Sequence, residues 1–149
     1  MAIDLTLLKK LRAETGISVS ECRQALEDAD GDYDKALKIL QSKAAEKAAK
    51  KADRETGQGL IETYVHAGKI GVMVKLLCET DFVARTDEFK NLAHEIALQI
   101  ASMHPKNVEE LLKQEFIKDP GKTIDQMVKE AIQKTGENIV VKDFVRYQM

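Results

Sequence analysis

The sequence has no tryptophan, only two cysteines and few aromatic residues, which make up 5% of its 149 residues. Two cysteines far apart in the chain, Cys22 and Cys78, do not form the framework of a disulfide-rich secreted domain. The longest apolar run falls far short of the roughly 20 residues that a membrane-spanning helix needs, and the N-terminus lacks a signal-peptide pattern. These absences favour a protein of the reducing cytoplasm and exclude a membrane span.

The sequence also lacks a dominant charge. Lysine and arginine number 23, aspartate and glutamate number 25, and the net charge is -2. No global basic field therefore draws this protein onto nucleic acid or an anionic membrane. The apolar fraction of 44% is ordinary for a globular protein. The length allows one compact domain, or a small domain with an appended module.

The first 42 residues are predicted to form three short helices. Apolar residues recur at helical spacing in each, and Gly16 and Gly31 end the first two helices. Ser18 and Glu21 have the spacing of a capping box at the start of the second helix. Because three helices this short bury little surface, we expect the module to be only marginally stable alone.

Residues 43–58 are predicted to be a linker. The segment begins KAAEKAAKKADR, and its apolar residues are almost all alanine, which predicts an exposed helix until Gly57 and Gly59 break it. The lysines could contact RNA. However, the charges spread around the helix, acids lie nearby and no aromatic residues interleave, so a solvated helix is favoured and no direct nucleic-acid contact is predicted.

Beyond residue 59 the apolar period changes from 3.6 to 2. Residues 60–66 and 70–79 alternate around a short turn at 67–69, which predicts a β-hairpin. Two further helices are indicated at about 87–103 and 123–136, with a short helical piece at 108–113, and the tail 139–147 is a predicted third strand. The expected fold is α+β, with a three-helix module (1–42), a helical linker (43–58) and a small antiparallel sheet packed with helices (59–149).

No catalytic or metal-binding pattern is found. The segment DPGKT at 119–123 resembles a phosphate loop, but Phe116 occupies the position of the first required glycine and Pro120 lacks a backbone N–H. A turn followed by a helix N-cap is predicted there instead. The three histidines have no metal-ligand spacing, and no Ser, Cys or His lies in a known nucleophile setting. The sequence therefore predicts neither an enzyme nor a metal or cofactor site, and both cysteines are expected in the core.

The most unusual segment is CETDFVARTDEF, residues 78–89, which places Phe82 beside Asp81 in a predicted loop. In one interpretation Phe82 tucks into the local core, while Asp81 or Asp87 caps the next helix. In the other, Phe82 protrudes and inserts into a partner, where its burial stabilises the complex by about 1.5–3 kcal/mol. The residues alone leave both interpretations open.

Several ordered segments together resemble the translation elongation factor Ts family over nearly the whole chain. They are LRAETGISVSECRQAL, GDYDKALKIL, KAAKKADRETGQGLI, CETDFVARTDEF, HEIALQIASMHP and GENIVVKDFVRY. The resemblance implies a ubiquitin-associated-type N-terminal module and a non-catalytic guanine-nucleotide exchange factor for elongation factor Tu. It also implies that Asp81 and Phe82, with Thr80 and Val83 beside them, enter the GTPase near its nucleotide site.

The resemblance implies further partner contacts. Arg12 and Val19 fall where the family's N-terminal module meets the GTP-binding domain, and Ser20 stands where many members carry Met. His66 matches a family histidine at a hairpin tip that faces the GTPase. Two other function classes stay open: a ubiquitin-like-binding adaptor, which has no use for TDFVAR, and an RNA-binding ribosome-associated factor, which salt-dependent tRNA binding would reveal.

The chain resembles the short form of the family, with one core copy and no inserted helical arm. A three-stranded sheet leaves an open edge, which proteins normally cover or pair. We therefore expect a homodimer and a two-to-two complex with the GTPase. The expected contact surfaces are the apolar alternating face of residues 70–78 and the tail 139–147.

Overall fold

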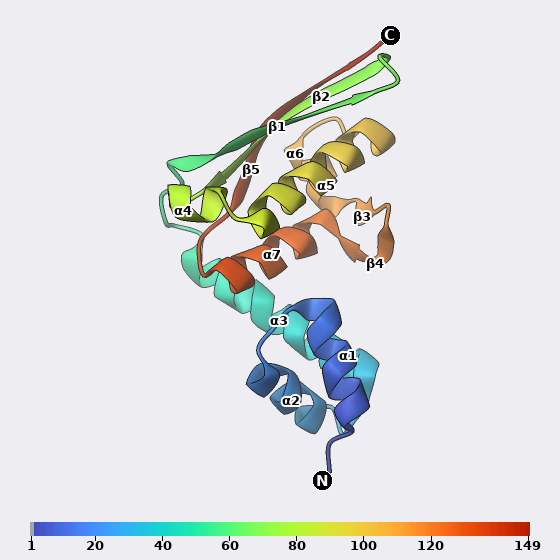
Figure 1. Cartoon of the computed structure of the whole chain (residues 1–149), viewed down its shortest axis with the longest axis vertical. Helices are drawn as coiled ribbons and strands as arrows, with labels where there is room; N and C mark the ends of the chain where they lie inside the picture. The colour runs from blue at the N-terminus through green and yellow to red at the C-terminus, as the bar shows by residue number, and fades with distance from the viewer. Residues whose placement is uncertain (1) are drawn as a thin grey trace.

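In the computed structural model, which describes residues 2–149, three helices form one end of an elongated molecule and a β-sheet forms the other (Figure 1). The helices are α1 (Leu5–Thr15), α2 (Val19–Asp28) and α3 (Tyr33–Lys51). Each begins at a residue whose side chain accepts a backbone N–H of the first turn: Asp4, Ser18 and Asp32. Their apolar stripes bury a small separate core that contains Cys22, which confirms the three predicted helices.

Helix α3 continues without interruption into the segment predicted to be an exposed linker. Ala44 and Ala48 are buried, and α3 packs against α7 (Ile124–Thr135). The expectation of an exposed linker is therefore wrong for this face of the helix. Alanine side chains allow two helices to approach closely, so a stripe without large apolar residues can still be buried.

The sheet consists of β1 (Gln58–His66), β2 (Ile70–Cys78) and β5 (Val140–Gln148), antiparallel in the order β1-β2-β5. Ala67 and Gly68, between β1 and β2, both have positive φ angles of 52° and 66°. This is the turn conformation that matches the twist of a hairpin. The predicted hairpin and the predicted third strand are both confirmed, which supports the α+β class.

Helix α5 (Asp87–Met103) covers one face of the sheet. The β2 side chains that point toward it are fully or nearly fully buried: Val72, Val74, Leu76 and Cys78. This is the alternating face that was expected to join two chains. Because α5 covers it within one chain, that expectation is wrong for this face, whereas the opposite face of the sheet carries exposed side chains.

The remaining elements complete the core. They are α4 (Asp81–Ala84), α6 (Val108–Lys113), β3 (Glu115–Phe116) and β4 (Asp119–Thr123). The DPGKT segment forms β4, which pairs with β3, and Thr123 then caps α7 in a capping box with Gln126. The predicted N-cap is confirmed, whereas strand pairing replaces the predicted turn.

Candidate functional site

The segment that follows β2 forms a single helical turn, α4, rather than the predicted loop. Thr80 caps α4, because its Oγ1 accepts the backbone N–H of Val83 at 3.3 Å. Thr86 caps α5 in the same way, accepting the N–H of Phe89 at 3.3 Å. The caps predicted at Asp81 or Asp87 are therefore wrong, since threonines one residue earlier carry out this role.

Phe82 projects from α4 into solvent. Of the four phenylalanines in the chain, Phe89 and Phe116 are buried, Phe144 is half-buried and Phe82 is 82% exposed. Val83 and Ala84, the next two residues, are buried and anchor α4 to the core. The interpretation in which Phe82 tucks into the local core is wrong, because the interior side of α4 is already occupied by Val83 and Ala84.

The charge of Asp81, beside Phe82, is paired with Arg85, the residue that ends α4. Asp81 Oδ2 lies 2.6 Å from Arg85 Nη2, one helical turn away, and both side chains are exposed. An exposed aromatic side chain next to polar and charged groups is the arrangement found at the centre of many protein interfaces. Val83, by contrast, presents almost no surface, so any role in binding is as the anchor of the helix.

The base of α4 is bonded to residues that sequence analysis did not identify. Glu137 Oε1 accepts the backbone N–H groups of Glu79 and Thr80 at 3.1 and 2.9 Å, and its Oε2 accepts the Thr80 hydroxyl at 2.6 Å. In return, Glu79 Oε1 accepts the backbone N–H of Asn138 at 2.7 Å. These partners lie more than fifty residues apart in sequence, so no local pattern indicates them.

The Cys78 thiol also contributes to this region. Burial raises the pKa of Cys78, so its sulfur stays protonated and donates to the Thr80 carbonyl at 3.1 Å. Cys22 and Cys78 are both buried free cysteines, which confirms the prediction that they are core residues.

Arg12 and Val19 flank the turn between α1 and α2, and both are exposed. The Lys134 side chain on α7 lies against Gly16 in the same turn: its Cε is 2.8 Å from where a Cβ of Gly16 would be. Lys134 lies three residues before Glu137, which bonds the base of α4. The C-terminal end of α7 thus lies between two places: the turn that Arg12 and Val19 flank, and the helix α4 that carries Phe82.

His66 lies apart from the other predicted residues. It is exposed at the end of β1, where its Nδ1 is 3.0 Å from the Tyr64 hydroxyl. Phe82 follows the opposite end of β2, which is nine residues long. At about 3.3 Å per residue, the two positions are separated by roughly 27 Å. A partner that contacts both must be a macromolecule.

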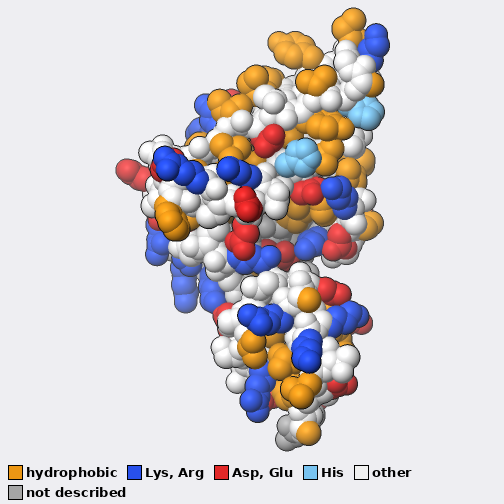
Figure 2. Space-filling view, in the orientation of Figure 1, with side chains coloured by type: hydrophobic (Ala, Val, Ile, Leu, Met, Phe, Trp, Pro, Cys, Tyr) orange, Lys and Arg blue, Asp and Glu red, His pale blue; other side chains and the backbone are white. Residues whose placement is uncertain are grey.

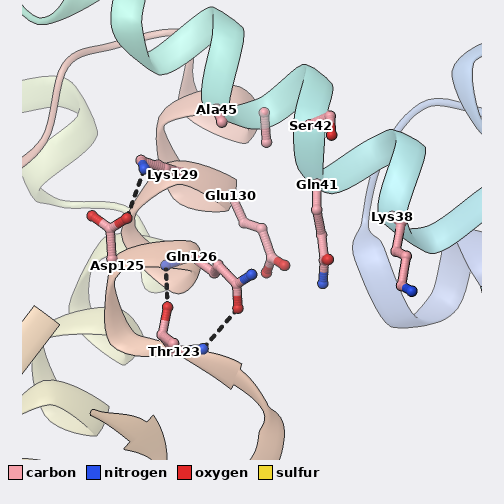
Figure 3. A pocket seen from close by; sticks show the side chains of 10 residues that line it. Lys38, Gln41, Ser42, Ala45, Thr123, Asp125, Gln126, Lys129 and Glu130 are labelled. Carbon is pink, nitrogen blue, oxygen red and sulfur yellow. Dashed lines mark hydrogen bonds and ion pairs between the residues drawn. The ribbon is translucent and has the colours of Figure 1, made fainter. Parts of the chain in front are cut away.

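An open cleft of about 490 Å³ lies between α3 and α7 (Figure 3). Its charged residues are mostly engaged with one another or with neighbours: Lys129 pairs with Asp125 at 2.6 Å, and Glu130 pairs with Lys122 at 3.2 Å. Thr123 and Gln126 are used in the capping box of α7. Most of the polar side chains that α7 contributes to the cleft are therefore already paired within the chain.

Over residues 2–149, no three His, Cys, Asp or Glu side chains come together as a metal site requires. The same residues include no helix long and apolar enough to cross a membrane. The predicted contact residues other than Val83 are exposed, and they lie at three places: α4 with its cap, the α1–α2 turn and the tip of the β1–β2 hairpin.

Comparisons with known proteins identify the family of this chain. The family described as Elongation factor TS matches residues 79–149. The elongation factor Ts of Thermodesulfovibrio yellowstonii is 38% identical over 193 positions, covering 100% of this chain and 97% of the relative. The elongation factors Ts of Coprothermobacter proteolyticus and Fervidobacterium nodosum are 40% and 42% identical, covering 100% of this chain and 99% of each relative.

These relatives are longer than this chain. An alignment of 193 positions against 149 residues leaves at least 44 positions at which the Thermodesulfovibrio protein has no counterpart here. The shared positions nevertheless run from one end of the chain to the other. The chain belongs to the elongation factor Ts family, whose members are non-catalytic guanine-nucleotide exchange factors of translation elongation.

Proposed function

We propose that this protein releases GDP from elongation factor Tu by inserting Phe82, with Asp81 beside it, near the nucleotide and Mg²⁺ site. The observation that carries the proposal is the 82% exposure of Phe82 on a helix whose next two residues are anchored in the core. An exposed phenylalanine contributes little to the free protein. Its burial in a partner stabilises the complex by about 1.5–3 kcal/mol.

Exchange of this kind needs no catalytic group. Mg²⁺ requires near-octahedral coordination, so a small displacement of the GTPase segments beside it weakens the ion and the phosphates together. The coupling is reciprocal: a factor that weakens GDP binding is itself released when nucleotide binds again. The protein therefore acts by differential binding to two states of its partner.

The three-helix module, of the ubiquitin-associated type, is proposed to dock on the GTPase. Arg12 and Val19 offer one cationic and one apolar side chain on the same exposed turn. His66 is proposed to make a separate contact at the hairpin tip. Docking at several separated positions orients the GTPase, so that Phe82 meets the nucleotide site rather than an arbitrary surface.

We further propose that two chains associate through the outer face of the sheet. This face carries five large exposed apolar side chains, and Figure 2 shows hydrophobic side chains gathered over the sheet end of the molecule. They are Ile61, Val65, Met73, Val145 and Tyr147. Lys75 and Asp143 lie on the same face. Exposed apolar side chains grouped on one face of a sheet mark an interaction site. A two-fold arrangement gives a two-to-two complex, and sedimentation equilibrium of the free protein at micromolar concentration tests it.

A direct role in binding RNA is less well supported. Among the linker cations, Lys47 pairs with Glu21 at 2.6 Å and Arg54 lies 3.5 Å from Glu79, so part of the positive charge is neutralised within the chain. We propose that the protein acts in the cytoplasm on elongation factor Tu without contacting nucleic acid. Binding of tRNA with a steep dependence on salt concentration would contradict this part of the proposal.

The direct test is release of labelled GDP from elongation factor Tu with an excess of unlabelled nucleotide. Catalytic amounts of the protein are expected to accelerate release by orders of magnitude, and free GTP and GDP are expected to compete with the protein for the GTPase. An unchanged rate of GDP release in the presence of a folded protein that binds the GTPase would overturn the proposal.

A further inference from the structure

We infer that Glu137 is a positioning residue for Phe82: its carboxylate fixes the base of α4, and so sets the direction in which Phe82 projects. The effect expected on nucleotide exchange rests on the proposed function. The positioning of α4 by Glu137 rests on the geometry of the free protein. Glu137 lies 55 residues after Phe82, between α7 and β5, and its side-chain hydrogen bonds go to Glu79 and Thr80 rather than to Phe82.

Helix α4 cannot fix its own orientation. It has only four residues, and a helix this short is unstable without tertiary contacts because nucleation is unfavourable. Its contacts with the core come from Val83 and Ala84. Phe82 itself packs against little, so the direction of its side chain depends on how the preceding residues, Glu79 and Thr80, are held.

Glu137 holds both of these residues. One carboxylate oxygen accepts their two backbone N–H groups, and the other accepts the Thr80 hydroxyl. A hydroxyl has one hydrogen, so donating it to Glu137 leaves the lone pairs of Thr80 Oγ1 free for the N–H of Val83. The carboxylate therefore orients the N-cap of α4, and the successive bonds strengthen one another.

A second carboxylate makes the arrangement reciprocal. The last backbone pair between β2 and β5 joins Leu77 and Val140. Beyond it, Glu137 bonds the backbone that leaves β2, while Glu79 bonds the N–H of Asn138 on the segment that leads into β5. The two side chains continue the pairing of the strands where backbone bonds have ended. As a result, α4 is fixed to the end of α7 as well as to β2.

The same segment is tied to the helical module. Asn138 is buried, and its Nδ2 donates to the carbonyl of Arg54, just after α3, at 3.0 Å. Arg54 Nη1 in turn donates to the carbonyl of Gly136 at 3.3 Å. These two hydrogen bonds join the segment that follows α3 to the backbone on either side of Glu137.

The first test uses the full-length protein alone. The amides of Ala84 and Arg85 donate to Thr80 and Asp81 carbonyls within α4 and do not touch Glu137. Glu137→Ala is expected to lower their protection against hydrogen exchange by about tenfold, because a charge-assisted bond is lost. Glu109→Ala, which removes an exposed carboxylate on α6 that pairs with Lys113, serves as control and should change neither amide. Unchanged protection in Glu137→Ala would overturn the inference.

The second test measures GDP release from elongation factor Tu. If Glu137 acts through Phe82, Glu137→Ala lowers the exchange rate at saturating factor by about tenfold, with a smaller change in Kd for the GTPase. The double variant Glu137→Ala, Phe82→Ala should then be no slower than Phe82→Ala alone. Additive losses would mean that Glu137 acts elsewhere and would contradict the inference.

A conservative variant separates positioning from folding. Glu137→Gln keeps one oxygen acceptor for the backbone N–H groups, so it should give a rate between wild type and Glu137→Ala, and it serves in place of Glu137→Ala if that variant does not fold. If the wild-type protein fails to release GDP, the proposed function fails, while the exchange of the Ala84 and Arg85 amides still decides whether Glu137 fixes α4.

Discussion

Individual positions show where the backbone leaves no room for a side chain. At Gly59, φ is +150°, and a Cβ would lie 2.1 Å from the backbone oxygen of Leu76 on the neighbouring strand. Any other residue therefore has to push β1 away from β2. At Gly57, two residues earlier, no atom of the described residues other than its chain neighbours lies within 4 Å of where a Cβ would be, although the two glycines look equivalent in the sequence.

Gly59→Ala is expected to lower the free energy of unfolding by about 2–3 kcal/mol, through backbone strain and the displaced strand. Gly57→Ala is the matched control and should change it by less than about 0.5 kcal/mol. Urea denaturation followed by circular dichroism measures both. Equal effects of the two substitutions would show that the close approach at Gly59 is not present in solution.

For Phe82, the sequence could define two positions, buried in the core or exposed on the surface, but could not choose between them. An aromatic residue next to an acid is compatible with a core position and with a surface position, because both depend on contacts made by distant segments. The occupants that exclude Phe82 from the core are its own neighbours Val83 and Ala84. The role of Glu137 could not be predicted from the sequence, because its hydrogen bonds join segments that only the tertiary fold brings together.

At the scale of elements, regular patterns were predictable and close contacts between helices were not. The hairpin, the three N-terminal helices, α7 with its Thr123 cap and the third strand follow from periodicity and capping residues. The burial of Ala44 and Ala48 does not, since an alanine stripe on a lysine-rich helix resembles a solvated one. Its partner surface on α7 lies about eighty residues further along the chain.

The ion pair between Glu21 on α2 and Lys47 on α3 predicts that the stability of the protein depends on pH. A hydrogen bond from Lys47, at 2.6 Å, lowers the pKa of Glu21 below its ordinary value of 4.5. Since the folded-state pKa is depressed, the stabilisation is present above pH 4.5 and is lost as pH falls through the folded-state pKa. Glu21→Gln should destabilise the protein by about 0.5 kcal/mol at pH 7, because the pair is partly exposed. Thermal unfolding measured from pH 7 down into the acid range checks this: a difference from wild type that does not shrink as the pH falls below 4.5 would contradict it.

The three-helix module is expected to increase the affinity for elongation factor Tu, and not to take part in the release of GDP itself. Deleting residues 2–42 leaves the alanine stripe of α3 in place over α7, so the remaining domain should stay folded. The Kd for elongation factor Tu should rise by about tenfold or more, because the contacts proposed for Arg12 and Val19 are lost. Isothermal titration calorimetry measures the change, and an unchanged Kd for the folded truncated protein would count against docking by this module.

For the whole molecule, the exposed face of the sheet predicts assembly. Met73 lies in the middle of this face and is 48% exposed, whereas Met103, at the end of α5, is 50% exposed but lies away from it. Met73→Asp should convert a dimer to a monomer at micromolar concentration, because it places an unpaired charge in an apolar interface. Met103→Asp should leave the dimer intact. Sedimentation equilibrium decides: a wild-type monomer, or equal effects of both substitutions, would contradict the proposed assembly.

The central claim is that Phe82 carries nucleotide exchange, and one rate measurement tests it most directly. Stopped-flow release of fluorescent GDP from elongation factor Tu should be slower by about tenfold or more with Phe82→Ala than with wild type, because about 1.5–3 kcal/mol of burial is lost. Thermal unfolding of this variant should be nearly unchanged, since Phe82 is 82% exposed. Ile117→Ala, which truncates an exposed apolar side chain between β3 and β4, should exchange as wild type does. Exchange at the wild-type rate by folded Phe82→Ala would contradict the account.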